Sequence, residues 1–302
     1  MAGWQDYLAA IGLLATLPIA WTARRGLTHT TLNTAWGWAL ATLLLWNAAW
    51  WLAHADTGVS SGIVDQLWYG VCVVALCPWI AVLGAQRPGV RVWNAFVLIP
   101  LIAVLMWPAA TLWFRGHVPA DFRLELPMVI GYGLVLVMGA GNYLGTAFAP
   151  AATLVIASQI LLLVPATPLV SEQTLSSGTA RLSATCLLIA GLVVAWRIGR
   201  RRSPSRSPYD AVWFDFVDRF GIVWAIRIRE RINDRARQEA WRARLEPEGF
   251  VWDAGIDERA RRETGARIDH TLRWLLRRFV DEPWLSERLG TEGAVDSGRG
   301  GD

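Results

Sequence analysis

Asp65 is the carboxylate whose position raises the question of chemistry inside a membrane, because it stands near the beginning of a long apolar stretch. A charge held at the middle of a bilayer is costly and marks a proton or ion path. Asp65 is not at the middle of its stretch but among its first residues, where a carboxylate can reach water. Its position therefore favours a solvated helix end or a helix cap over an ion path.

Four uncharged polar side chains fall inside apolar stretches, namely Asn47, Asn94, Asn142 and Gln159. Amide side chains in such places more often form hydrogen bonds between helices than bind a ligand. We therefore expect these four residues to join helices.

Two loops that we expect on the same side of the membrane carry side chains able to ligate a metal: His54, Asp56, His117 and Asp121. Together they could form a metal- or proton-binding site. Nothing in their spacing requires one, and the same residue types are common in solvated turns. We therefore expect solvated loops, and the sequence predicts no metal, no cofactor and no catalytic residue.

Every basic side chain other than histidine is arginine, because the sequence contains no lysine. Retinal and pyridoxal phosphate are bound as Schiff bases of a lysine, so both chemistries are excluded. The lysines of the Walker A motif and of protein kinases are missing as well. The three cysteines, Cys72, Cys77 and Cys186, lie in apolar runs without metal-ligand spacing, where thiols usually act as small apolar groups.

The elements that must position these residues are seven apolar stretches, over residues 7–21, 32–53, 64–85, 93–114, 127–148, 151–170 and 182–202. A helix needs about 17–25 residues to cross a bilayer, so the first stretch, residues 7–21, is short for a span. The last stretch ends in an arginine cluster and divides the chain into two parts. We expect residues 1–202 to form a polytopic transmembrane domain of about seven helices.

Arginine counts favour one orientation of that domain. Residues 24, 25, 87, 91, 197, 200, 201 and 202 put eight arginines on one side, and residues 115, 123 and 181 put three on the other. Because cytoplasmic loops carry the excess of positive charge, we expect an external N-terminus and a cytoplasmic C-terminus. A GxxxG spacing from Gly141 to Gly145 favours close helix packing inside the bundle, although a homo-oligomer remains an alternative.

The last third of the chain is rich in charge, with 18 Arg and 19 acidic residues after residue 202, a net charge of −1. We expect a linker at residues 203–208, a mainly helical cytoplasmic domain at 209–290 and a disordered tail at 291–302. The domain should contain one long helix over 209–243, a short hairpin around Glu246–Gly249, a second helix over 257–280 and a final turn of helix over 282–289. The fold class is thus an all-α membrane protein with this small domain attached.

Both expected helices of the domain carry an apolar stripe. The first stripe contains Trp213, Phe220, Trp224 and Ile228, and the second contains Ile268, Leu272, Leu275 and Phe279. An exposed stripe of this size would bind or aggregate, so something must cover it. The two stripes could cover each other in a small helical core, which we favour; a protein partner or the membrane surface is the alternative.

Nucleic acid is not expected as a partner, because a net charge of −1 does not suit binding to a phosphate backbone. The blocks WFDFVDRFGIVWAIRIRERIN (213–233), GFVW (249–252) and IDHTLRWLLRRFVDEPWLSERLG (268–290) resemble the tail of a family of multi-span membrane proteins of planctomycete-type bacteria. The resemblance covers about the last third of the chain. It implies a bacterial inner (plasma) membrane and assigns neither an activity nor functional residues.

These observations favour a non-enzymatic module of the lipid bilayer that signals or scaffolds through a cytoplasmic protein partner. A small-molecule transporter or channel is the alternative, because several of the apolar stretches contain polar residues and prolines. An intramembrane enzyme would need paired ionisable residues at depth, and the sequence offers none at the expected depth.

Overall fold

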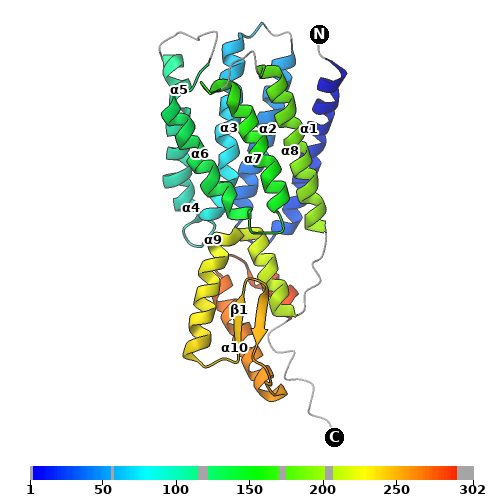
Figure 1. The fold of residues 1–302 in the computed structure, drawn as a ribbon, viewed down its shortest axis with the longest axis vertical. Helices are drawn as coiled ribbons and strands as arrows, with labels where there is room; N and C mark the ends of the chain where they lie inside the picture. Colours follow the sequence, from blue (N-terminus) through cyan, green and yellow to red (C-terminus); the bar gives the residue numbers. More distant parts are fainter. Residues whose placement is uncertain (1–2, 56–57, 115–121, 170–174, 201–206, 291–302) are drawn as a thin grey trace.

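The computed structural model describes residues 3–55, 58–114, 122–169, 175–200 and 207–290. Figure 1 shows two parts placed end to end. Residues 3–200 form a bundle of long helices, called the helix bundle below, and residues 207–290 form a smaller part, called the C-terminal segment. Most of the expected linker and the whole of residues 291–302 lie outside the described residues.

The helix bundle consists of α1 (Trp4–Ala23), α2 (Asn33–His54), α3 (Ser61–Leu83), α4 (Val90–Trp93), α5 (Ile99–Phe114), α6 (Leu126–Ala140), α7 (Ala149–Leu163) and α8 (Ser177–Arg200). Three short 3-10 turns, η1 (Arg24–Leu27), η3 (Gly141–Tyr143) and η4 (Val164–Ala166), extend α1, α6 and α7. A π-helical turn, η2 (Asn94–Leu98), joins α4 to α5, so residues 90–114 run as one long helix.

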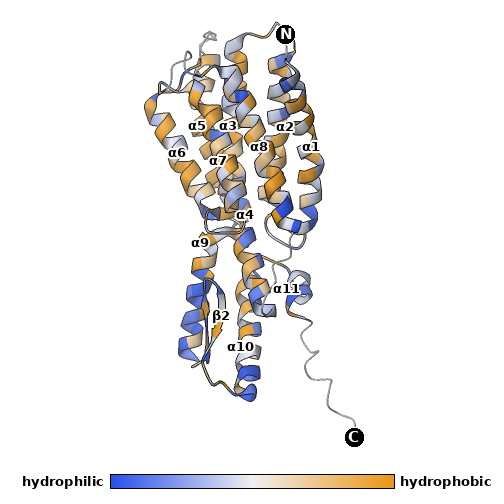
Figure 2. Ribbon diagram, turned by 45° about the vertical axis from the view of Figure 1, so that its right-hand side comes forward, coloured by the Kyte–Doolittle hydropathy of each residue, from blue (hydrophilic) through white to orange (hydrophobic). Residues whose placement is uncertain are grey.

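Six helices of the described chain are long and apolar enough to cross a membrane, which indicates a membrane-embedded protein. Figure 2 shows the contrast, with apolar residues dominating the helix bundle and hydrophilic residues frequent in the C-terminal segment. The one expected helix outside these six is α2, which packs along α3 and is 22 residues long. It is less apolar than the other six because it contains five tryptophans and two asparagines.

The central helix of the bundle is α3, which contacts α2, α5, α6 and α7 and is by far the most deeply buried of the six. Indole rings fill the space between α2 and α3, where Trp46 and Trp50 both meet Trp68 edge to face, at centroid distances of 5.8 and 6.5 Å. Edge-to-face contacts between large rings add to the energy of burial. The bundle therefore has a filled core around α3.

The fifth apolar stretch forms a shorter helix than its hydropathy predicts. We expected residues 127–148, but α6 ends at Ala140 and the chain turns through η3. Glycines make this region a poor helix former, and two of them allow close approaches. A Cβ on Gly139 would lie 2.7 Å from the side chain of Trp79, and one on Gly145 would lie 2.8 Å from Ile222 of the C-terminal segment.

The C-terminal segment consists of α9 (Pro208–Gln238), β1 (Ala243–Glu246), β2 (Gly249–Trp252), α10 (Glu258–Leu276) and α11 (Glu282–Leu289). The expected hairpin is confirmed: β1 and β2 are antiparallel, with Leu245 opposite Phe250. Polar side chains of α9 hold it in place. Asn233 exchanges two hydrogen bonds with the backbone of Leu245, and Asp210 accepts one from Phe250 N at 2.7 Å.

The expectation of one continuous helix over residues 209–243 is wrong in two respects. The helix ends at Gln238, and it is broken at Gly221, whose φ of 79° and ψ of 177° are not helical. Figure 1 shows α9 rising to the base of the helix bundle, turning there and descending again. The break therefore lies where the two parts of the molecule meet.

Candidate functional sites

The apolar stripes of the C-terminal segment meet each other and the base of the helix bundle. All eight stripe residues are buried in one cluster: Trp213, Phe220, Trp224, Ile228, Ile268, Leu272, Leu275 and Phe279. The ring of Phe279 lies 4.9 Å from Trp224 and 5.2 Å from Phe220. Leu32, Val82 and Ala85 of the bundle belong to the same cluster. The stripes are thus covered partly by each other and partly by the bundle, and we call this contact region the junction.

A single amide side chain forms hydrogen bonds to the backbone on both sides of the break in α9. Asn142, on η3 of the bundle, donates from Nδ2 to Phe220 O at 3.1 Å and accepts at Oδ1 from Val223 N at 2.9 Å. A break inside a helix frees backbone carbonyls on one side and N–H groups on the other. Asn142 satisfies one of each. Gly221 makes this possible, since a Cβ there would lie 2.1 Å from Asn142 Nδ2.

Backbone hydrogen bonds join the chain after α10 to two loops of the bundle. Phe279 O accepts from Thr31 N at 2.8 Å, and Arg278 O accepts from Arg87 N at 2.9 Å. Asp281 N donates to His29 O at 2.8 Å. The indole of Trp224 adds a buried bond from Nε1 to Val82 O at 3.1 Å. The C-terminal segment is therefore fixed to the bundle by bonds that do not depend on long flexible side chains.

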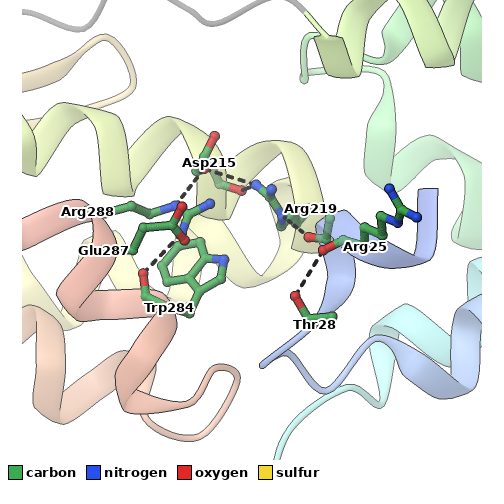
Figure 3. A network of polar contacts seen from close by, with 8 residues as sticks. Arg25, Thr28, Asp215, Arg219, Trp284, Glu287 and Arg288 are labelled. Carbon is green, nitrogen blue, oxygen red and sulfur yellow. Dashed lines mark hydrogen bonds and ion pairs between the residues drawn. The ribbon is translucent and has the colours of Figure 1, made fainter. Parts of the chain in front are cut away.

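Charged side chains surround the junction on the side of α11. Figure 3 shows Asp215 of α9 between Arg219 and Arg288, at 3.1 and 2.8 Å. Arg219 also donates to Gly26 O of the bundle at 3.3 Å. Arg288 stacks over Trp284, with its guanidinium carbon 4.1 Å from the ring centroid. These contacts tie α9, α11 and the first loop of the bundle together.

Asp218, on α9 at the junction, is a titratable group of the C-terminal segment whose pKa is raised in the folded protein. Desolvation by burial raises the pKa of Asp218, and the nearby Asp215 raises it further. A hydrogen bond from Ala147 N, at 2.9 Å, and the charge of Arg219 oppose this shift without cancelling it. Its charge is thus disfavoured in the folded protein.

Asp65 lies at the opposite end of α3 and forms an ion pair with Arg181 of α8. The two side chains are only 26% and 19% exposed. Asp65 stands in the second turn of α3 and Ser60 is the N-cap residue, so Asp65 does not cap the helix. The guanidinium carbon of Arg181 lies 5.7 Å from the centroid of the Trp68 ring. The pair joins α3 to α8 at the end of the bundle farthest from the junction.

A small cavity of about 30 Å³ lies beside this ion pair, and Tyr69, Cys72 and Phe122 contribute to its walls. A cavity needs roughly 10–15 Å³ to hold one water molecule. The space next to Asp65 and Arg181 thus suits water rather than an organic substrate.

The other polar residues of the bundle mostly bond within it. Gln159 accepts from Tyr132 Oη at 3.1 Å and donates to Ala75 O at 3.3 Å. Asn94 accepts from Trp38 Nε1 at 3.3 Å. Asn47 donates to Leu43 O of its own helix, and its buried Oδ1 has no hydrogen-bond partner among the described residues.

Three of the four loop residues that could in principle ligate a metal, Asp56, His117 and Asp121, lie outside the described residues. His54 stacks on Trp50 at a centroid distance of 4.6 Å, and its Nε2 lies 3.7 Å from Asp6 Oδ1. Within the described ranges, no group of three His, Cys, Asp or Glu side chains could hold a metal ion.

Sequence reasoning missed two partnerships. The arginine pattern of the sequence predicts only a loop charge at Arg181, although this residue lies one turn into α8 and pairs with Asp65. The contact between Asn142 and Gly221 was missed as well. A lone glycine inside a helical pattern was the available signal, because such a glycine often has a packing reason.

No protein-family model, curated protein sequence or solved structure matches this chain.

Proposed function

We propose that this protein is a non-enzymatic membrane module that signals or scaffolds through its C-terminal segment. In this proposal all seven long helices cross the cell's inner membrane, the N-terminus is external and the C-terminal segment contacts a cytoplasmic protein partner. The observation that carries the proposal is the junction. A segment held by backbone bonds and a shared apolar core keeps a fixed position relative to the membrane, as a signalling or scaffolding surface requires.

The distribution of arginines supports the orientation. Arg24, Arg25, Arg87 and Arg91 lie at the end of the bundle next to the C-terminal segment, as do the last arginines of α8. Positive charge gathers on the cytoplasmic side of membrane proteins. A reporter fused after residue 302 that behaves as external would contradict this orientation.

Trp274 offers a way to test the role of the C-terminal segment without disturbing the junction. Its side chain is 47% exposed and lines a groove of about 450 Å³ between α9 and α10. Exposed tryptophans often dominate the energy of protein interfaces. Val251 on the hairpin is a matched control, because it is apolar and 44% exposed but does not line this groove.

The experiment compares single variants in a strain that lacks the chromosomal gene. We expect Trp274→Ala to lose complementation of the deletion phenotype, and Val251→Ala to retain it, at equal membrane levels and melting temperatures. Complementation by Trp274→Ala would contradict a role for this surface.

The ion pair between Asp65 and Arg181 is the observation that favours the alternative, a transporter or channel. Transporter sites lie near the middle of the bilayer and are large enough for the substrate, whereas this pair is near one end of α3 and adjoins a cavity of about 30 Å³. A transporter would need the ion pair of Asp65 and Arg181 and not the groove that Trp274 lines. If Asp65→Asn abolishes complementation while Trp274→Ala retains it, the transporter is the better proposal.

A further inference from the structure

A basic groove lies beside the junction, where the apolar helices end. Its cavity of about 760 Å³ is lined mainly by residues of the loop after α3, by α9 and by Arg278 in the chain after α10. Three arginines, Arg87, Arg227 and Arg278, come together there from these three elements. A second cavity of about 130 Å³ shares Arg227 and Arg278 with the first, so the groove continues along α9.

Two of these arginines have no acidic partner in the described part of the chain. Arg87 pairs with Asp281 at 2.7 Å. The side chains of Arg227 and Arg278 form no ion pair with any described residue, and no carboxylate of the described ranges lines either cavity. Arg227 stacks over Trp224, with its guanidinium carbon 5.1 Å from the ring centroid, and both residues line the groove. Arginines gathered without counter-charges suit an anion, and a phosphate can accept two hydrogen bonds from one guanidinium.

The other wall of the groove is apolar and continuous with the outer face of the bundle. Leu83, Trp93 and Met138 line it, and Met138 is 57% exposed. Val92 and Phe96, which lie on either side of Trp93 in the same long helix, are 58% and 76% exposed. In a membrane-embedded bundle these side chains face acyl chains. The groove thus joins a basic pocket to a lipid-facing surface at the level where lipid headgroups lie.

We propose that this groove binds the phosphate headgroup of an anionic membrane phospholipid. Arg227 and Arg278 hold the phosphate, with Arg87 at the rim, and an acyl chain lies along Trp93 and Met138. A soluble phosphate compound would find the same arginines but would gain nothing from the apolar wall. A lipid uses both.

The experiment measures lipid binding to the purified full chain in detergent by native mass spectrometry, with phosphatidylglycerol and phosphatidylcholine as probes. We expect phosphatidylglycerol to bind more tightly. The double variant Arg227→Gln/Arg278→Gln should weaken that binding by about a hundredfold, because each charge-assisted contact contributes about tenfold. Equal binding of the two lipids by the unaltered chain would overturn the proposal.

Arg261→Gln/Arg262→Gln is the matched control. Arg261 stacks over Trp252 at 5.2 Å, much as Arg227 stacks over Trp224, and Arg262 is an exposed arginine of the same segment. This control should bind phosphatidylglycerol like the unaltered chain, and both double variants should melt at the unaltered temperature without lipid. An equal loss of binding in the control would show that general positive charge, and not the groove, attracts the lipid, and would overturn the assignment.

Two further measurements separate a lipid from a free phosphate. Met138→Ser should weaken binding of long-chain phosphatidylglycerol but leave the short-chain dihexanoyl form unaffected. Inorganic phosphate should not displace the long-chain lipid. If inorganic phosphate displaces it, or if Met138→Ser has no effect on the long-chain lipid, the occupant is a soluble phosphate compound and the lipid proposal is wrong.

Discussion

Replacing Asn142 with alanine should destabilise the junction by more than the loss of one hydrogen bond would. The change removes the hydrogen bonds to Phe220 O and Val223 N, at 3.1 and 2.9 Å. Both backbone groups were freed by the break at Gly221 and lie at a site where Asn142 is 2% exposed. A buried polar group without a partner costs about 1–3 kcal/mol. We therefore expect a loss of about 2–4 kcal/mol in the free energy of unfolding, since Val223 is only half-buried and water can replace part of the contact.

Gly221→Ala should act on the same contact from the other side. The conformation at φ 79° and ψ 177° belongs to a region that is nearly restricted to glycine and costs other residues about 1–3 kcal/mol. The new Cβ would also lie 2.1 Å from Asn142 Nδ2, so the amide must move and lose its bonds. Because both single variants lose the same two bonds, the double variant should be only about as unstable as Gly221→Ala alone. The cost of the double variant should be smaller than the sum of the two single costs by about 2–4 kcal/mol.

The assay is SDS-induced unfolding of the purified full chain in detergent, followed by circular dichroism. Asn47→Ala is the control, because Asn47 is also a buried asparagine but bonds only to its own helix. It should cost less than about 1 kcal/mol, since its Oδ1 already lacks a hydrogen-bond partner among the described residues. Additive costs for Asn142→Ala and Gly221→Ala, or equal costs for the two asparagine variants, would refute this account of the junction.

Two more predictions concern the charges of the C-terminal segment. Arg273→Ala should lower the free energy of unfolding by about 2–3 kcal/mol, because the buried guanidinium bonds to Asp269 and Glu282. As a control in the same assay, Arg259→Ala should cost less than about 0.5 kcal/mol, because Arg259 belongs to a solvent-exposed pair. Equal costs for the two variants would contradict the role given to burial. Because the pKa of Asp218 is raised in the folded protein, the folded state holds the proton of Asp218 more tightly than the unfolded state does. The stabilisation from this proton is complete below the ordinary pKa of 3.8 and is lost as the pH rises through the pKa of the folded state. Melting curves should therefore show Asp218→Asn at least as stable as the unaltered chain at neutral pH, with the advantage vanishing in acid, and a variant less stable at neutral pH would contradict the shift.

The sequence predicts those features that depend on local pattern. The hairpin follows from the turn residues between Leu245 and Phe250, and the limits of α11 follow from Pro283 at its start and Gly290 at its end. The stripe periodicity correctly indicates helices for α9 and α10. Each of these features is decided by residues within a few positions of one another, so no tertiary information is needed.

The features that sequence reasoning missed depend on residues far apart in the chain. Asn142 and Gly221 are 79 positions apart, and neither residue alone indicates the other. Nothing in the local pattern indicates that Arg273 is buried, yet its side chain lies between α10 and α11, where it pairs with Asp269 and Glu282. A helical pattern shows which face a residue occupies, but an arginine on that face can lie against solvent or against a pair of carboxylates. Only the packing of the next helix decides between them.

The position of α3 connects the two ends of the helix bundle. Asp65, near its first turn, pairs with Arg181, and Val82, near its last, accepts the indole N–H of Trp224. At 1.5 Å per residue, these positions are about 26 Å apart along the helix axis. A helix packed on all sides shifts as a body rather than bending residue by residue. Breaking the ion pair with Asp65→Asn should therefore weaken the hydrogen bond from Trp224 to Val82 at the other end of α3, next to the basic groove. The proposed signalling function needs no cavity through the core, and the filled interior around α3 is compatible with that proposal.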